Sequence, residues 1–136
     1  MHGSLSPELL KQECYLVGRV FQSKALGRLL WSLVLQESKA GTEQSQFGGV
    51  CSISFKHFEQ MKKHHLFLKF DKRIKAETGL LLDRIQYQQL AACPVLSLIV
   101  SSAWFLANVD QIPRCENEQD RIISRYWTHN TTSIHA

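Results

Sequence analysis

The longest uninterrupted hydrophobic stretch lies in the C-terminal half of the chain. No charged residue occurs between Arg84 and Asp110, and the segment 90–109 within this interval (LAACPVLSLIVSSAWFLANV) is almost wholly apolar or small. A helix rises about 1.5 Å per residue, so about 20 apolar residues can cross a hydrocarbon core of about 30 Å. The pattern therefore predicts a transmembrane helix over 90–109. The alternative is the buried central helix of a small helical fold, because such a helix is also apolar on all sides.

The first forty residues have the spacing of amphipathic helices. Ser6-Pro7-Glu8 is typical of a helix start, with a capping hydroxyl, a proline at the first helical position and an acid in the first turn. Apolar residues then recur at three- and four-residue spacings, at Leu9, Leu10, Cys14, Val17, Val20 and Phe21. A second apolar run, 26–35, is too short to span a bilayer and predicts a buried or interfacial helix.

The middle of the chain begins with a polar segment. Residues 38–49 (SKAGTEQSQFGG) are rich in turn-forming residues and lack periodicity, which predicts a loop. In the next six residues, 50–55, apolar and polar side chains alternate. This alternation indicates either a short strand or the start of the helix that follows.

These patterns together predict a mainly α-helical chain of about four or five helices with little or no sheet. At 136 residues the chain has room for one folded domain. We divide it into a basic helical region over 1–89, the candidate transmembrane or central helix over 90–109, and a short polar tail over 110–136.

The charge is modest overall but concentrated in one segment. Sixteen basic and twelve acidic residues give a net charge of +4, yet the segment 56–75 holds seven Lys and Arg residues against two acids, with phenylalanines interleaved. Such a segment can be a solvated helix face, a lipid-binding patch beside a membrane, or a nucleic-acid contact. The candidate lipid- or partner-binding residues are Lys62, Lys63, Lys69, Lys72, Arg73 and Lys75.

The same distribution bears on orientation in a membrane. The segment 56–89 has eight Lys and Arg residues, whereas the chain after residue 109 has three. Positive charge favours the cytoplasmic side, so we expect a cytoplasmic N-terminus. Asn130-Thr131-Thr132 matches the N-glycosylation pattern and lies in the tail that would be translocated, which makes Asn130 a candidate glycosylation site.

We find no pattern typical of a catalytic, cofactor or metal site. The four cysteines are far apart and form no CxxC pair, so neither a zinc knuckle nor a thioredoxin-like site is encoded locally. Nothing orients His57 toward Cys51 as a general base would require. His57 and His64 are two helical turns apart, whereas two ligands of one metal on a helix are typically four residues apart. We therefore expect no enzymatic activity, no cofactor and no small-molecule substrate.

The sequence favours a non-enzymatic, single-pass membrane protein that acts through protein or lipid interaction. Its expected partners are membrane lipid or a membrane protein, with nucleic acid as a less favoured partner. The alternative is a small α-helical adaptor or nucleic-acid-associated subunit, soluble in the cytoplasm or nucleus, whose core helix is 90–109.

Overall fold

Seven α-helices make up most of the part of the chain that the structure describes. A computed structural model describes residues 6–38, 49–109 and 111–128. The α-helices are α1 (Pro7–Val20), α2 (Lys24–Ser38), α3 (Phe55–Lys63), α4 (Phe67–Thr78), α5 (Gln89–Ala92), α6 (Pro94–Asn108) and α7 (Glu116–Ile123). Two 3-10 turns, η1 (Gly49–Cys51) and η2 (Leu82–Arg84), and a π-helical turn, η3 (Ser124–Thr128), complete the elements. The predicted helical class is confirmed, but four or five helices was too low a number.

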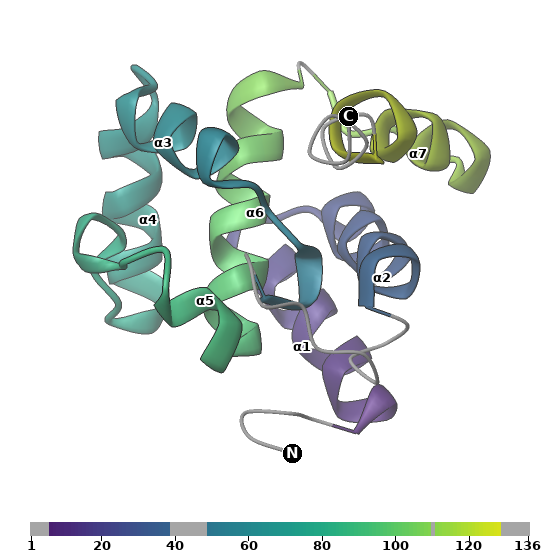
Figure 1. Ribbon diagram of the computed structural model, residues 1–136, viewed down its shortest axis with the longest axis horizontal. Helices are drawn as coiled ribbons and strands as arrows, with labels where there is room; N and C mark the ends of the chain where they lie inside the picture. Colours follow the sequence, from purple (N-terminus) through teal and green to yellow (C-terminus); the bar gives the residue numbers. More distant parts are fainter. Residues whose placement is uncertain (1–5, 39–48, 110, 129–136) are drawn as a thin grey trace.

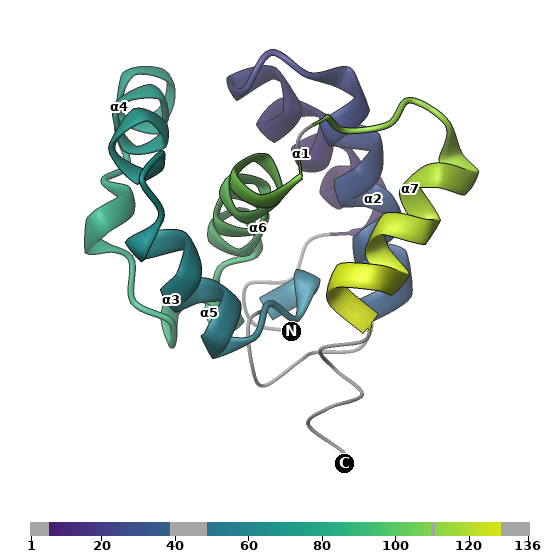
Figure 2. The ribbon, with the colours of Figure 1, turned by 90° about the horizontal axis from the view of Figure 1, so that it is seen from above.

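Helix α6 occupies the centre of the molecule. Figure 1 shows it between α3, α4 and α5 on one side and α1, α2 and α7 on the other, and the view from above in Figure 2 shows the same arrangement. Every residue from Ser97 to Phe105 is buried. The neighbouring helices each turn an apolar side toward α6, so a single hydrophobic core runs through the described part of the chain.

The predicted transmembrane span over 90–109 is not a single helix. Cys93 has an extended backbone, with φ −130° and ψ 103°, and separates the four-residue helix α5 from the 15-residue helix α6. Pro94 accounts for the break, because proline restricts the residue before it to extended conformations and favours the first position of a new helix. Helix α6 is about 22 Å long at 1.5 Å per residue. Among the described residues, no helix has both the length and the apolar character needed to cross a bilayer.

Two buried serines of the central helix form hydrogen bonds with different partners. Ser102 donates its hydroxyl hydrogen to the Leu98 carbonyl one turn back, at 2.7 Å. Ser97 instead accepts a hydrogen bond from the backbone N–H of Cys51, at 3.3 Å. This second bond joins η1 to α6, so a polar side chain fixes a loop segment against the core.

The N-terminal helices form a close antiparallel pair. Helix α1 begins at Pro7 after an N-cap serine, Ser6, whose hydroxyl accepts from the backbone N–H of Leu9 at 3.3 Å, as predicted. The pair is tight where two glycines meet. A Cβ at Gly18 would lie 2.8 Å from the backbone nitrogen of Gly27 and 2.6 Å from the Ser23 carbonyl oxygen. Only glycine lets the two backbones approach this closely.

The segment 50–55 leads into α3 and forms no strand. Cys51 ends the 3-10 turn η1, Ile53 is buried, and Ser54 is the N-cap of α3, its hydroxyl accepting from the backbone N–H of His57 at 3.0 Å. Neither alternative describes the whole segment: its first residues belong to the 3-10 turn η1, and only Ser54, as N-cap, and Phe55 belong to the start of α3. The central part of the predicted loop, residues 39–48, lies outside the described residues.

The C-terminal helices cover the core from the side opposite α3 and α4. Gln119 on α7 is buried and its amide donates to the carbonyls of Ala25, at 3.0 Å, and Pro113, at 2.7 Å. Trp127 in η3 is 1% exposed and its indole N–H donates to the carbonyl of Cys51. The described part of the segment that we predicted as a polar tail therefore contributes core residues. Asn130 lies outside the described residues.

Candidate binding surfaces

Helix α4 is covered on one side only and turns a basic surface outward. Phe70 and Ile74 face the core, and the helix ends at Thr78. Its C-cap is Gly79, whose φ of +78° lies in the left-handed region that glycine adopts at no steric cost. At 100° per residue, the opposite side carries one leucine among cationic side chains. We call this surface the α4 basic face: Leu68, Lys69, Lys72, Arg73, Lys75 and Ala76.

Part of the α4 basic face borders a shallow groove. Lys69, Lys72 and Arg73 line it together with Leu68, and its volume is about 660 Å³. Leu68 is 71% exposed, the largest exposed fraction among the large hydrophobic residues of the described segments. Glu77 also lines the groove. The face thus combines clustered positive charge with an apolar side chain that is mostly exposed to solvent.

Two of the six predicted basic residues, Lys62 and Lys63, lie away from the α4 basic face, and a third, Arg73, is also bonded within the fold. Lys62 donates its ammonium hydrogen to the carbonyl of Ile85 at 2.8 Å and lies 4.8 Å from the ring centre of Phe58, so it supports the fold. Arg73 borders the groove but also donates to the carbonyl of Val20 at 3.2 Å. Lys63 lines a different groove. The structure therefore brings together Lys69, Lys72, Arg73 and Lys75 on one helix face and separates Lys62 and Lys63 from them.

A second groove lies along α3 and reaches the end of α6. Its volume is about 630 Å³. We call it the α3 groove; it is lined by Phe55, Lys56, Glu59, Gln60, Lys63, His64 and Asn108. The sequence did not indicate it, because its amide groups come from positions 48 residues apart that are brought together only by the packing of α3 on α6. The one local signal was Phe55, an exposed aromatic residue at the start of a helix that also carries Lys56, Lys62 and Lys63.

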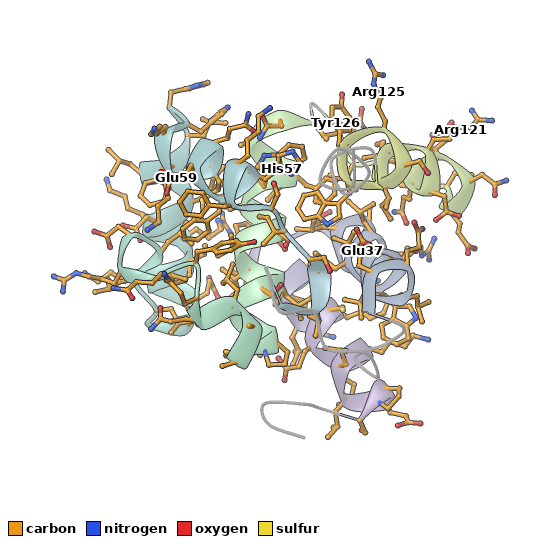
Figure 3. The ribbon with its side chains drawn as sticks, in the orientation of Figure 1. Glu37, His57, Glu59, Arg121, Arg125 and Tyr126 are labelled. Atoms are coloured by element: carbon orange, nitrogen blue, oxygen red, sulfur yellow. The ribbon has the colours of Figure 1, made fainter. Side chains whose placement is uncertain are left out.

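Beneath the α3 groove lies a cluster of aromatic rings. The imidazole of His57 stacks on Trp104, with ring centres 4.1 Å apart, and lies 5.1 Å from the ring centre of Trp127. Figure 3 shows His57 on the side of α3 that is turned toward the C-terminal helices, with Glu59 of the same helix farther from them. His57 is 8% exposed, and its Nδ1 has no hydrogen-bond partner among the described residues.

Burial favours the neutral form of the His57 imidazole. Desolvation, with a smaller contribution from the positive charge of Lys56, lowers the pKa of His57 from 6.5 to about 4. The folded protein therefore binds fewer protons than the unfolded chain between these two pH values. The contribution of His57 to stability is therefore fully present above pH 6.5 and is lost progressively as the pH falls toward 4.

We expect His57→Phe to remove this part of the pH dependence. Phenylalanine keeps a flat ring against Trp104, carries no proton and leaves no unpartnered nitrogen, so its free energy of unfolding at neutral pH should equal or exceed that of the wild type. The measurement is urea unfolding of both proteins at several pH values from neutral to 4. The difference between the two curves isolates His57 from the other histidines. Parallel curves over this range would contradict the assignment.

The cysteines offer no reactive thiol in the core. Cys14 and Cys51 are buried, Cys93 is half-buried and Cys115 is exposed, and all four are free thiols. Burial raises the pKa of Cys14 and of Cys51, which keeps both protonated at neutral pH. In the segments that the structure describes, no group of three or more His, Cys, Asp or Glu side chains is placed to hold a metal ion.

Comparison with known proteins identifies no relative. No family model matches the chain, and neither the curated proteins nor the solved structures contain a match.

Proposed function

We propose that this chain is a non-enzymatic interaction protein that binds the anionic surface of a membrane through the α4 basic face. The observation that carries the proposal is the placement of Leu68, 71% exposed, among the cationic side chains of one outward helix face. Basic residues near an anionic bilayer each contribute about 1 kcal/mol, and an apolar side chain among them can enter the boundary between headgroups and acyl chains.

The surroundings of α4 support this attachment. The helix lies at the edge of the molecule (Figure 1, Figure 2), so its outer face can approach a flat surface. Of the two acids on α4, Asp71 is engaged within the fold, because its carboxylate accepts the backbone N–H of Leu82 at 2.8 Å, whereas Glu77 is exposed at the groove and partly offsets its positive charge. The cytoplasmic leaflet is the anionic one. We therefore assign the protein to the cytoplasmic face of a membrane, as a peripheral component in place of the single-pass protein that the sequence suggested.

The proposal predicts salt-sensitive binding to vesicles. The full chain should sediment with vesicles of phosphatidylcholine and phosphatidylserine at low salt, bind phosphatidylcholine alone weakly, and dissociate in high salt, because exposed charges are screened within about 8 Å at physiological ionic strength. Lys69→Gln combined with Lys72→Gln should weaken binding about 30-fold, which corresponds to about 2 kcal/mol for two charges.

A charge-matched variant makes this test specific. Lys11→Gln combined with Lys24→Gln also removes two positive charges, but from exposed positions on α1 and α2. This control should bind vesicles as the wild type does. Leu68→Ser should also weaken binding at low salt, because it removes the apolar contact, but it should leave the salt dependence unchanged because it removes no charge. Equal losses in the two double variants would show a net-charge effect and would contradict a role for α4.

A further inference from the structure

The α3 groove is separate from the α4 basic face and has a different chemical character. Its lining combines an exposed aromatic ring, Phe55, with two lysines, Lys56 and Lys63, and with the amides of Gln60 and Asn108. Phe55 is 56% exposed although its ring contacts Tyr87 at a centroid distance of 5.3 Å. An accessible ring beside positive charge and amide groups is the combination that binds a flat, polar, negatively charged molecule.

Trp104 fixes the direction in which both amides point. Its indole N–H, which can only donate, is bonded to Gln60 Oε1 at 3.4 Å, so the free group of Gln60 is its NH₂. Its backbone carbonyl, which can only accept, is bonded to Asn108 Nδ2 at 2.9 Å, so the free group of Asn108 is its carbonyl oxygen. The groove therefore presents one donor and one acceptor whose assignment does not depend on an arbitrary amide orientation.

The helical register of α3 places the other groups around this pair. Lys56 and Gln60 are four residues apart and so lie along one side of the helix, while Phe55 and Glu59 lie on the adjacent side. A ring that stacks on Phe55 and bonds the amides has a cationic ammonium group beside it for a phosphate. The carboxylate of Glu59, on the Phe55 side, can accept sugar hydroxyls.

We propose that the α3 groove binds a nucleotide unit. The base stacks on Phe55. The NH₂ group of Gln60 donates a hydrogen bond to an acceptor atom of the base, and an N–H group of the base donates one to the side-chain carbonyl of Asn108. All four bases offer an adjacent donor and acceptor on an edge, so this pair identifies a base without selecting one. The phosphate binds Lys56 and Lys63. The source of the unit is either a free nucleotide or a base of single-stranded RNA, since both present the same chemistry.

The test titrates the full chain with four probes and follows tryptophan fluorescence, because Trp104 contacts both amides. AMP should bind more tightly than adenosine, which lacks the phosphate, and than ribose 5-phosphate, which lacks the base. A hexamer of oligoadenylate that binds much more tightly than AMP identifies single-stranded RNA as the source, and equal affinities identify the free nucleotide. If ribose 5-phosphate binds as well as AMP, or if no probe binds at low salt, the proposal is wrong.

Variants separate the base contacts from general charge. Phe55→Leu keeps an apolar contact with Tyr87 but loses the ring and should weaken AMP binding roughly tenfold, while Phe55→Tyr should restore it. Gln60→Glu still accepts the Trp104 N–H but offers no donor and should weaken AMP binding at least as much. Lys63→Gln should reduce AMP affinity and leave adenosine affinity unchanged, and Lys24→Gln should change neither. Loss of AMP binding in Lys24→Gln equal to that in Lys63→Gln would overturn the assignment.

Discussion

Replacing Trp127 with alanine should lower the free energy of unfolding by about 3–5 kcal/mol, a large part of the stability of a chain of this size. The indole is 1% exposed, stacks on Phe105 with ring centres 4.9 Å apart, and meets Trp104 edge-on at 5.4 Å. Its removal leaves a cavity bounded by α3, α6 and η1. The measurement is urea unfolding monitored by circular dichroism.

A second variant at the same position separates packing from hydrogen bonding. Trp127→Phe keeps an aromatic ring against Phe105 but lacks the N–H that donates to the carbonyl of Cys51. Because an unsatisfied buried carbonyl costs about 1–3 kcal/mol, this variant should fall between the wild type and Trp127→Ala. If the free energy of unfolding of Trp127→Ala lies within about 1 kcal/mol of the wild-type value, the C-terminal helices do not stabilise the core in solution.

The helical class was predictable because its signals are local. The Ser6-Pro7 helix start and the spacing of Leu10, Cys14 and Val17 are contained within a few turns, and the structure places these three residues on the buried side of α1. The alternation over 50–55 was ambiguous for the same reason. A strand needs a partner elsewhere in the chain, and in the described part Ser54 caps a helix instead.

The transmembrane prediction failed because an uncharged run does not specify what surrounds it. Residues facing lipid and residues facing other helices are equally apolar, so composition alone cannot distinguish the two. Pro94 was the informative residue. It divides the run predicted as one helix, with Cys93 extended before it and α6 beginning at the proline. The contribution of the segment after 109 to the core was not predicted. Gln119, Ile123 and Trp127 are all buried, but each has polar neighbours in the sequence, so their common burial becomes visible only once the helix is placed against the core.

The candidate surfaces depended on tertiary structure to different degrees. Positive charge over 56–75 was visible in the sequence, but its division between α4 and the α3 groove follows from the turn between the two helices. The engagement of Lys62 with the Ile85 carbonyl joins positions 23 residues apart. The amide pair of Gln60 and Asn108 could not be predicted from the sequence. Exposed amides occur throughout a protein surface, and only the contacts of both with Trp104 show that these two lie together.

Ile99→Arg should abolish cooperative folding, or lower the free energy of unfolding by more than about 4 kcal/mol. Ile99 is 1% exposed in the middle of α6, and the residues on either side of it are buried as well. The packed interior leaves no space for the longer side chain, and a guanidinium there would lose its hydration without gaining a carboxylate, which is among the most costly changes a core can undergo. The measurement is the yield of soluble protein together with thermal unfolding followed by circular dichroism.

A matched substitution tests whether position or charge decides the outcome. Ala92→Arg places the same side chain in the same uncharged run, but at an exposed residue of α5. In the packed fold this side chain extends into water, so Ala92→Arg should change stability by no more than about 0.5 kcal/mol. If the run instead crossed a bilayer as one helix, Ile99→Arg would chiefly reduce membrane insertion, since a central charge costs about 2.5–3.5 kcal/mol there. Retention of Ile99→Arg in membranes after an alkaline carbonate wash, with unchanged yield, would contradict both the packed α6 and the spanning helix.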